Sequence, residues 1–173
     1  VYGVRNLTDI VNHLEGKIKI EKSSQTSFEK FTHDEKFDFH DVRGQERAKR
    51  GLLIAAAGGH NVAMYGPPGT GKTMLAKAFT GILPDLSYDE ALEATSIHSV
   101  AGSLQKNFII HPPFRSPHHT SSYVSLVGGG ATPKPGEITL AHRGVLFMDE
   151  FPEFERRVIE SLRQPLEEKV ISV

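Results

Sequence analysis

The sequence contains no cysteine, so it offers neither disulfide bonds nor thiolate ligands for a structural metal site. It has no apolar run near the ~20 residues that a membrane-spanning helix needs, and no recognisable signal peptide. We therefore expect a cytoplasmic protein without a membrane partner. The formal net charge is -1, which gives no overall footprint for nucleic acid, although a neutral total can hide a local basic strip.

The composition is that of a globular domain, with 173 residues of which 38% are hydrophobic and 24% charged. Residues 1–20 contain a short run of apolar residues at helical spacing, and the polar residues 21–38 are predicted to be a linker. Residues 39–173 form the main domain. The chain starts with Val1 and stops at Val173 without a terminating signal, so we expect both ends to be cut.

Apolar spacing predicts helices over 45–57, from Lys72 onward, and to about Val100 after a capping box of Ser87 and Glu90. A last helix is predicted from Pro152, which Pro165 should kink or end early. The apolar runs at 61–65 and 145–148 are typical of buried parallel strands. Residues 111–136 are rich in proline and glycine and are predicted to be loop.

The eight residues 66–73 read Gly-Pro-Pro-Gly-Thr-Gly-Lys-Thr and match the phosphate-loop pattern G-x-x-x-x-G-K-[ST] at every fixed position. Glycines let several backbone N–H groups converge on phosphate oxygens, and the following helix directs its positive dipole end at them. Lys72 would place its charge on the outer phosphates, and the Thr73 hydroxyl would be a ligand of Mg²⁺. We predict an ATP site rather than a structural turn. Gly66, Pro67, Pro68, Gly69, Thr70, Gly71, Lys72 and Thr73 are expected to hold the phosphates, and Met74 is also expected to bind the nucleotide.

An acidic pair follows the apolar run at 145–148. A buried strand that ends in two carboxylates places them at the edge of a parallel sheet where ligands bind. Asp149 would hold Mg²⁺, and Glu150 would orient and polarise the attacking water. By itself the pair could equally cap the next helix. Downstream of a complete phosphate loop we favour catalysis, with Lys72 and Glu150 as the catalytic residues.

The longer motifs resemble those of AAA+ ATPases. Residues 38–45 (DFHDVRGQ) are similar to the segment before the phosphate loop, whose backbone near Val42 and Gly44 contacts adenine in that family. Residues 113–119, 127–130 and 135–150 resemble the magnesium-chelatase-like AAA+ proteins, most closely the ComM/YifB branch. The resemblance implies an α/β P-loop NTPase fold, a three-layer αβα sandwich with a parallel sheet, that binds ATP and Mg²⁺ and forms a hexameric ring.

Two functions compete within that group. Chelatase subunits drive insertion of Mg²⁺ into a porphyrin, whereas ComM-like proteins resemble motors that migrate DNA branches during recombination of incoming DNA. Chelatase subunits typically carry an aspartate-arginine pair where this chain has Pro67-Pro68, which favours the DNA motor. Residues 1–20 also resemble the end of a Lon-like domain and its connecting helix, which chelatase motor subunits lack. A nucleotide-binding scaffold without catalysis should lack Lys72, Asp149 or Glu150, and all three are present.

Residues 127–141 correspond to an insert that, in relatives, points into the central pore of the ring. Lys134 and Arg143 could then meet DNA phosphates. The alternative is a glycine- and proline-rich surface turn with a solvated lysine. A different cluster, His111, His118 and His119, invites a metal hypothesis, but packing or hydrogen bonding near the nucleotide is favoured because no cysteine or spaced carboxylate completes a ligand set.

The resemblance also implies a sheet order of 5-1-4-3-2, in which the strand bearing Asp149 does not touch the strand before the phosphate loop. The strand between them, which carries the sensor residue, would follow Val173. The arginine finger and the lid would also follow Val173. Residues 170–173 would be the first strand of the hairpin before it. The fold is thus expected to be incomplete at its C-terminal end, with two unpaired central edges and poor ATP hydrolysis by this piece alone.

Overall fold

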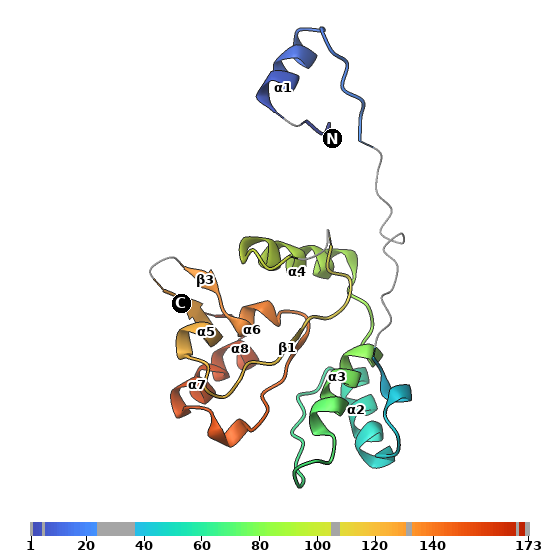
Figure 1. The fold of residues 1–173 in the computed structure, drawn as a ribbon, viewed down its shortest axis with the longest axis vertical. Coiled ribbons are helices and arrows are strands. Elements are labelled where there is room, and N and C mark those ends of the chain that lie inside the picture. The colour runs from blue at the N-terminus through green and yellow to red at the C-terminus, as the bar shows by residue number, and fades with distance from the viewer. Residues whose placement is uncertain are drawn as a thin grey trace. The chain divides into compact units, whose positions relative to one another are not determined.

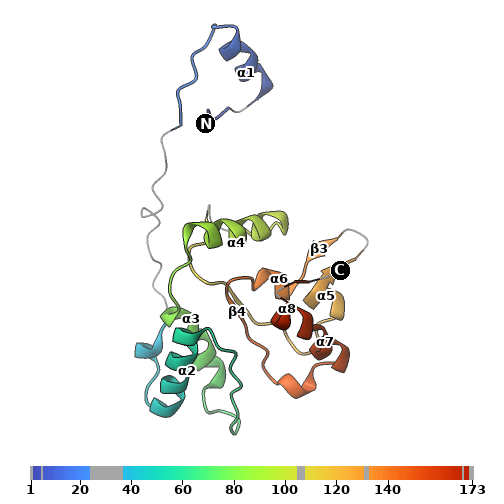
Figure 2. The same cartoon turned by 180° about the vertical axis from the view of Figure 1, so that it is seen from behind.

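The computed structural model describes residues 2–4, 6–23, 37–104, 108–130, 133–168 and 170–171 (Figures 1 and 2). Its internal contacts divide the chain into two units, residues 1–32 and residues 33–173, which are described separately. Most of the expected linker, residues 24–36, lies outside the described residues. None of the described helices is long and apolar enough to span a lipid bilayer.

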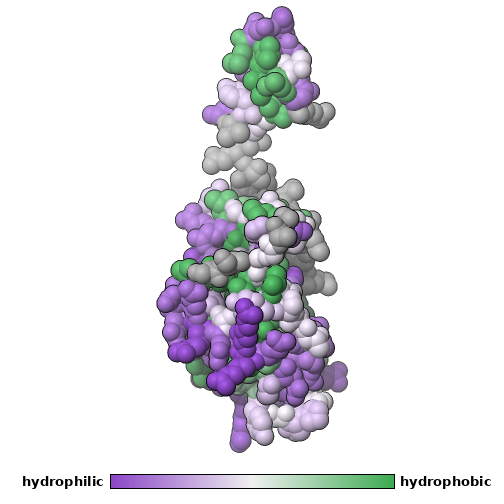
Figure 3. Space-filling model, turned by 90° about the vertical axis from the view of Figure 1, so that its left-hand side faces the viewer, coloured by the Kyte–Doolittle hydropathy of each residue, from purple (hydrophilic) through white to green (hydrophobic). Residues whose placement is uncertain are grey.

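The first unit is built on helix α1 (Leu7–Leu14), which confirms the helix predicted from apolar spacing. The side chain of Asn6 caps the helix by accepting a hydrogen bond from the Asp9 N–H at 2.9 Å. Leu7 and Leu14 are 75% and 80% exposed, so α1 does not bury its apolar face within this unit. Figure 3 shows apolar side chains gathered on the surface of this unit.

Three helices of the second unit begin close to where the sequence predicts them. They are α2 (Glu46–Gly58), α3 (Lys72–Ile82) and α4 (Tyr88–Val100). The capping box before α4 is present, because the Ser87 N–H donates to Glu90 Oε2 at 3.0 Å and the Glu90 N–H donates to Ser87 Oγ at 3.4 Å. Local signals alone therefore located these helices.

Helices α2 and α3 pack side by side around one buried cluster (Figure 1). Its buried members are Val42, Leu52, Leu75 and Ala78, and Met64 packs against them from the segment before the phosphate loop. Burying a side chain of leucine size contributes about 1.5–3 kcal/mol. The cluster thereby fixes the start of α3, where the phosphate loop ends, against α2.

The buried strand predicted at residues 61–65 is absent, and this prediction is wrong. Residues 60–71 contain no strand, and Val62 and Tyr65 are 47% and 106% exposed. A strand needs a neighbour to exchange its ladder hydrogen bonds, and no strand among the described residues lies against this segment. An apolar run without such a neighbour stays unpaired.

A parallel pair joins β1 (Phe114–Arg115) to β4 (Val145–Leu146). The strand predicted at 145–148 is therefore present but shorter, although the Phe147 N–H still donates to the Arg115 carbonyl oxygen at 2.8 Å. The pairing of β4 with β1 was not predicted, and among the described residues β4 does not pair with the segment before the phosphate loop. The described residues form a mixed α/β fold with a small parallel sheet rather than a complete three-layer sandwich.

Residues 111–136 were predicted to be loop, and this is wrong in part, since the region contains several short elements. Helix α5 (Tyr123–Val127) leads into a hairpin of β2 (Gly128–Gly129) and β3 (Lys134–Pro135), which helix α6 (Glu137–Leu140) follows. Proline and glycine here separate short elements instead of marking an irregular coil. Residues 131 and 132, at the tip, lie outside the described residues.

Gly128 shows why glycine is needed at the base of this hairpin. Its φ is 108°, and a Cβ atom at this position would lie 2.7 Å from the carbonyl oxygen of Lys134. Only glycine combines that backbone conformation with such a close approach of the two strands.

The chain then continues through a short 3-10 helix (Phe151–Glu153), α7 (Arg156–Ser161) and α8 (Arg163–Glu167). The break that Pro165 was predicted to cause is confirmed. Proline lacks an N–H, and its ring clashes with the carbonyl four residues earlier, which belongs to Ser161, the last residue of α7. Residues 169, 172 and 173 lie outside the described residues, and with them half of the strand expected at 170–173.

A second buried cluster holds this part of the unit together. It contains Leu126 of α5 and the residues Phe154 and Val158, with Tyr123 and Met148 packed against it. The cluster fixes the helix before the hairpin to the segment that follows β4.

We predict that Gly144→Ala lowers the free energy of unfolding by about 1–3 kcal/mol, as overpacking commonly does. A Cβ atom on Gly144 would overlap the backbone of Pro113, whose carbonyl oxygen accepts the Val145 N–H at 2.8 Å beside the parallel pair. Urea unfolding followed by circular dichroism measures the change.

The matched control is Gly51→Ala. Gly51 is exposed in the middle of α2, and a Cβ atom there would have no neighbour within 4 Å. Alanine should therefore raise the free energy of unfolding by about 0.5–1 kcal/mol through helix propensity. Equal effects of the two substitutions would contradict the close approach at Gly144.

Candidate nucleotide-binding site

The phosphate-loop motif forms a glycine-rich turn that leads directly into α3. Gly69 and Gly71 have φ values of 77° and 82°, which side chains other than glycine rarely adopt. Gly71 is the residue immediately before Lys72, the first residue of the helix. The unsatisfied N–H groups and the positive dipole end of α3 therefore lie at the loop.

Side chains hold several carbonyl oxygens of this loop. Lys72 Nζ donates to the carbonyl oxygens of Gly66 at 3.0 Å and Pro67 at 2.9 Å. The Thr70 hydroxyl also donates to Pro67, at 3.0 Å, and Gln45 Nε2 donates to the Thr70 carbonyl oxygen at 3.2 Å. The ammonium expected to bind phosphate thus lies against its own loop.

The two residues expected to hold Mg²⁺ meet across 76 positions of sequence. The Thr73 hydroxyl, at the start of α3, donates a hydrogen bond to Asp149 Oδ2 at 2.8 Å. The other carboxylate oxygen of Asp149 accepts the N–H of Glu150 at 3.0 Å. The end of β4 and the phosphate loop therefore face each other, as an ATP site requires.

This pair of oxygen donors suits Mg²⁺. That ion prefers oxygen ligands and usually takes only one or two from protein, completing its shell with water and substrate phosphates. Among the described residues, no group of three or more His, Cys, Asp or Glu could hold a metal. Thr73 and Asp149 fit an ion that arrives with a nucleotide.

Glu150 sits in a strained turn and contacts a histidine. Its φ is 54°, in the left-handed region. Its carboxylate lies 2.9 Å from Nδ1 of His119, which comes from the segment after β1. The His119 ring also lies 4.2 Å from that of His118 and edge-on to Phe154 at 6.5 Å, measured between ring centroids. The carboxylate expected to polarise water is therefore held from a second segment.

The three histidines singled out from the sequence do not form a common site. His111 Nδ1 lies 2.7 Å from Asp85, and His118 Nδ1 lies 2.8 Å from the Thr120 hydroxyl. His119 is the member that reaches the acidic pair.

The residues expected near adenine differ in accessibility. The backbone of Val42 is occupied, since its N–H donates to the Phe39 carbonyl oxygen at 3.3 Å and its own carbonyl accepts from Lys49 Nζ. Gly44 is exposed with φ of 66°. Met74, which was expected at the nucleotide directly after the phosphate loop, is 42% exposed. Hydrogen bonds to a base would thus come from groups after Val42 rather than from Val42 itself.

A pocket of about 290 Å³ adjoins the loop between α2, residues 62–65 and the start of α3. Gln45, Leu52, Met64, Thr70 and Lys72 are among the residues that line it. It contains both polar groups of the loop and apolar side chains of the core, as a nucleotide pocket does.

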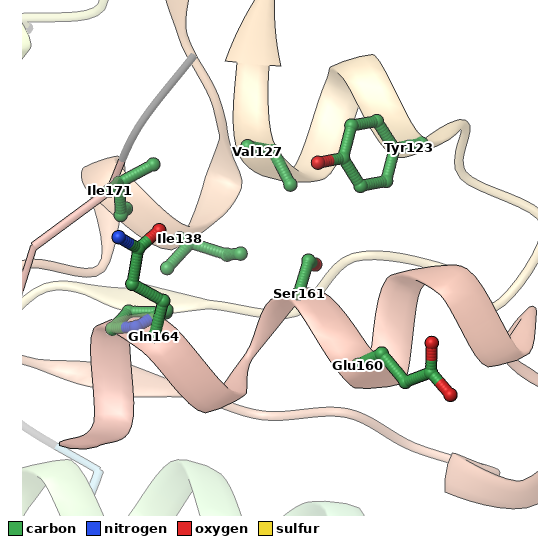
Figure 4. Close-up of a pocket in the computed structure, with 8 residues that line it drawn as sticks. Tyr123, Val127, Ile138, Glu160, Ser161, Gln164 and Ile171 are labelled. Carbon is green, nitrogen blue, oxygen red and sulfur yellow. The ribbon is translucent and has the colours of Figure 1, made fainter. Parts of the chain in front are cut away.

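A second pocket of about 220 Å³ lies away from the loop, between α5, α6, α7 and α8 (Figure 4). In this view Ser161 points toward Val127 and Tyr123, whereas Glu160 points away from them. No phosphate-loop residue lines this pocket, so we do not assign it to the nucleotide.

The insert at residues 127–141 is the β2–β3 hairpin with α6. Lys134 is exposed on β3, where an anionic partner could reach it. Arg143 is already engaged, because its Nε donates to Glu93 at 3.0 Å and its Nη1 donates to Glu90 at 3.3 Å. These contacts raise the pKa of Arg143, chiefly through the Glu93 hydrogen bond. Both cations expected to meet DNA are exposed, and Arg143 is already paired with two carboxylates.

A bidentate ion pair ties the insert to β1. Arg115 Nε and Nη2 donate to the two carboxylate oxygens of Glu137 at 2.6 Å and 2.7 Å. This hydrogen bonding raises the pKa of Arg115. Two parallel hydrogen bonds fix the relative orientation of the two side chains as well as their distance. The pair therefore holds the start of α6 against β1.

Three of these contacts were not foreseen from the sequence: Gln45 with Thr70, Arg115 with Glu137, and His119 with Glu150. The motifs at residues 38–45 and 113–119 did contain all three donors. Because each partner lies 22 to 31 positions further along the chain, spacing within a motif could not identify it.

Comparison with known proteins adds a family match. A protein-family model described as "Magnesium chelatase, subunit ChlI" matches residues 38–173. Among curated proteins, "Uncharacterized protein YifB" of Escherichia coli is 54% identical over 164 residues, which cover 94% of this chain and 32% of that protein.

Two further relatives carry functional names. "Competence protein ComM" of Haemophilus influenzae is 49% identical over 170 residues, which cover 96% of this chain and 33% of that protein. "Lon protease 2" of Bacillus subtilis is 28% identical over 144 residues, which cover 77% of this chain and 26% of that protein. The chain spans about a third of the length of the YifB and ComM relatives.

We predict that Lys72→Ala reduces ATP binding below detection in isothermal titration calorimetry. The ammonium is the charge held at the phosphate loop, and hydrogen bonds to charged groups contribute about 1.5–3 kcal/mol each. Lys77→Ala is the control, since Lys77 is an exposed lysine on the same helix, outside the motif. Unchanged ATP affinity of the Lys72 variant would contradict the phosphate-site assignment.

Proposed function

The chain belongs to the magnesium chelatase subunit ChlI family, and we propose that it is the ATP-binding and ATP-hydrolysing core of a AAA+ motor of the ComM/YifB type. In the full-length protein this motor acts on DNA. The family supports an ATPase of the AAA+ class with the P-loop fold, and the complete three-layer sandwich and the hexameric ring are part of the proposal.

The contact between Thr73 and Asp149 carries the proposal. The two side chains come from the phosphate loop and from the end of β4, and their oxygens lie 2.8 Å apart. A structural glycine-rich turn would have no reason to face a carboxylate at a strand end. Phosphoryl-transfer sites need this arrangement, because the ion that neutralises the phosphates has to touch both the loop and the acidic strand.

The protein's own groups divide the work of hydrolysis. Lys72 and the N–H groups at the start of α3 bind the outer phosphates, while Thr73 and Asp149 supply oxygen ligands. Bound Mg²⁺ would draw charge from the phosphate oxygens. Glu150 accepts a hydrogen bond from the attacking water and orients it.

His119 holds Glu150 for that task. Its Nδ1 lies 2.9 Å from one carboxylate oxygen of Glu150, and its ring also contacts the rings of His118 and Phe154. The carboxylate is 64% exposed and would otherwise sample several rotamers. We assign His119 as a positioning residue that acts through Glu150.

DNA as the substrate is supported by three observations. One relative is named a competence protein, Pro67-Pro68 replaces the pair typical of chelatase subunits, and the insert is a hairpin that exposes Lys134. The family description favours a second candidate, an ATPase that drives metal insertion into a porphyrin. The two functions differ in which partner stimulates hydrolysis.

We predict that His119→Ala lowers kcat for ATP hydrolysis about tenfold or more while the Kd for ATP stays within twofold. Without His119, Glu150 would orient the attacking water less well, and general-base activation of that water contributes on the order of 10²–10⁴-fold to the rate. The contacts to the phosphates would stay intact. Steady-state hydrolysis and calorimetric ATP binding, on the longest natural chain that contains these residues, measure both constants.

His119→Asn should recover part of the rate, since its amide nitrogen can donate from the position of Nδ1. His111→Ala is the matched control, because His111 contacts Asp85 instead of Glu150. A His119 variant with unchanged kcat, or one that loses rate and ATP affinity equally, would contradict the positioning role.

We also predict that branched DNA stimulates ATP hydrolysis by that same full-length chain, and that Lys134→Ala weakens the stimulation without changing the basal rate. Each lysine–phosphate contact releases a counterion, so the stimulation should fall steeply as salt is raised. Hydrolysis is measured against DNA concentration at several salt concentrations.

Lys17→Ala serves as the control, since this lysine lies in the first unit and pairs with Glu15 at 2.6 Å. Stimulation by a chelatase partner with porphyrin, and none by DNA, would establish the alternative function. If Lys134→Ala and Lys17→Ala lost the same amount of stimulation by DNA, that result would contradict DNA contact by the insert.

A further inference from the structure

The Thr70–Gly71 peptide of the phosphate loop is held by a side chain from outside the loop. Lys72 and Thr70, which hold the carbonyls of Gly66 and Pro67, both belong to the motif itself. The Thr70 carbonyl oxygen instead accepts from Gln45 Nε2, 25 residues earlier, at 3.2 Å. Nothing in the phosphate-loop pattern demands a residue at that position.

This contact fixes the direction of an N–H group. A trans peptide unit is planar, so its carbonyl and its N–H point to opposite sides. When the Thr70 carbonyl is turned toward Gln45, the N–H of Gly71 is turned away from Gln45. Gly71 is the residue just before α3, where N–H groups serve as phosphate donors.

Loss of one donor would matter more here than in most loops. Pro67 and Pro68 have no N–H, so these two positions contribute only carbonyl oxygens. The backbone donors of the loop are therefore limited to Gly66 and to the residues from Gly69 onward.

The backbone alone does not prevent this peptide from turning over. Rotation of the Thr70–Gly71 peptide changes ψ of Thr70 and φ of Gly71, and glycine accepts either sign of φ at little cost. Gly71 now has φ of 82°, and a Cβ atom there would meet only Met74, at 3.8 Å. A hydrogen bond to the carbonyl is thus what distinguishes the two orientations.

Gln45 has a backbone that suits other residues better. Its φ is 61°, a conformation that favours glycine or asparagine. It stands at the N-cap of α2, where serine, threonine, asparagine or aspartate would cap the helix, yet its side chain makes no capping bond within α2, all of whose residues are described. The longer amide instead reaches Thr70.

We propose that Gln45 is a positioning residue of the nucleotide site, which sets affinity for phosphates by locking the Thr70–Gly71 peptide with its N–H available to the ligand. This rests on the proposed nucleotide-binding function and adds to it a residue that lies outside the phosphate-loop motif. The bond also ties residues 42–45, which lie before α2, to the loop that binds the phosphates.

The test uses Gln45→Glu in the longest natural chain containing these residues. Glutamate has the same shape but no N–H to donate, so the lock is lost while the residue's size and backbone remain. We expect the Kd for ATP to rise about two- to tenfold, the effect of one such hydrogen bond, with KM rising and kcat unchanged. Inorganic pyrophosphate, used to displace a fluorescent nucleotide, should lose affinity by the same factor, since the effect acts on phosphate and not on the base.

Gln45→Gly separates this role from a merely structural one. Glycine relieves the left-handed backbone, so the melting temperature should stay the same or rise, while ATP and pyrophosphate affinity fall as in Gln45→Glu. Affinities of both variants within twofold of the wild type, or a loss for ATP but none for pyrophosphate, would overturn the proposal. Lys72→Ala is measured alongside. If this variant keeps its ATP affinity, the proposed nucleotide site itself is contradicted. If it loses ATP affinity while the Gln45 variants do not, the role of Gln45 alone is rejected.

Discussion

The hydrogen bond from the Thr73 hydroxyl to Asp149 joins the two parts from which an ATP site has to be assembled. The phosphate-binding part stands on the cluster formed by Val42, Leu52, Leu75 and Ala78, which seats α3 against α2. The acidic part stands on the cluster around Leu126, Phe154 and Val158. Because each part has its own core, their local geometries are set independently, and the 2.8 Å contact measures how closely they approach.

Within the phosphate-binding part, the arrangement of carbonyl oxygens decides what the loop can bind. Carbonyls that face the ligand would repel phosphate, so they have to be turned outward and satisfied elsewhere. Lys72, Thr70 and Gln45 provide their partners in this structure. The two prolines remove N–H groups and stiffen the first half of the loop.

The sequence predicted features whose cause is local. The capping box at Ser87 and the break before Pro165 depend on residues within four positions of each other, and both are present. The strand at residues 61–65 failed because a strand depends on a neighbour that the sequence pattern does not contain. Arg143 was expected to be available to DNA, but its partners Glu90 and Glu93 lie about 50 positions earlier, on another helix. His119 reached Glu150 through the pairing of β1 with β4, which no motif spacing reveals.

The insert is connected to the acidic part of the site rather than to the phosphate-binding part. Before the hairpin, Leu126 belongs to the cluster that contains Phe154, against whose ring His119 packs. After the hairpin, Glu137 is held by Arg115 of β1, four residues before His119. A force applied to the hairpin would therefore act on the segment that positions Glu150 before it acted on Lys72 or Gln45. In a motor built this way, a partner bound at the insert would change the rate of hydrolysis more than the affinity for ATP.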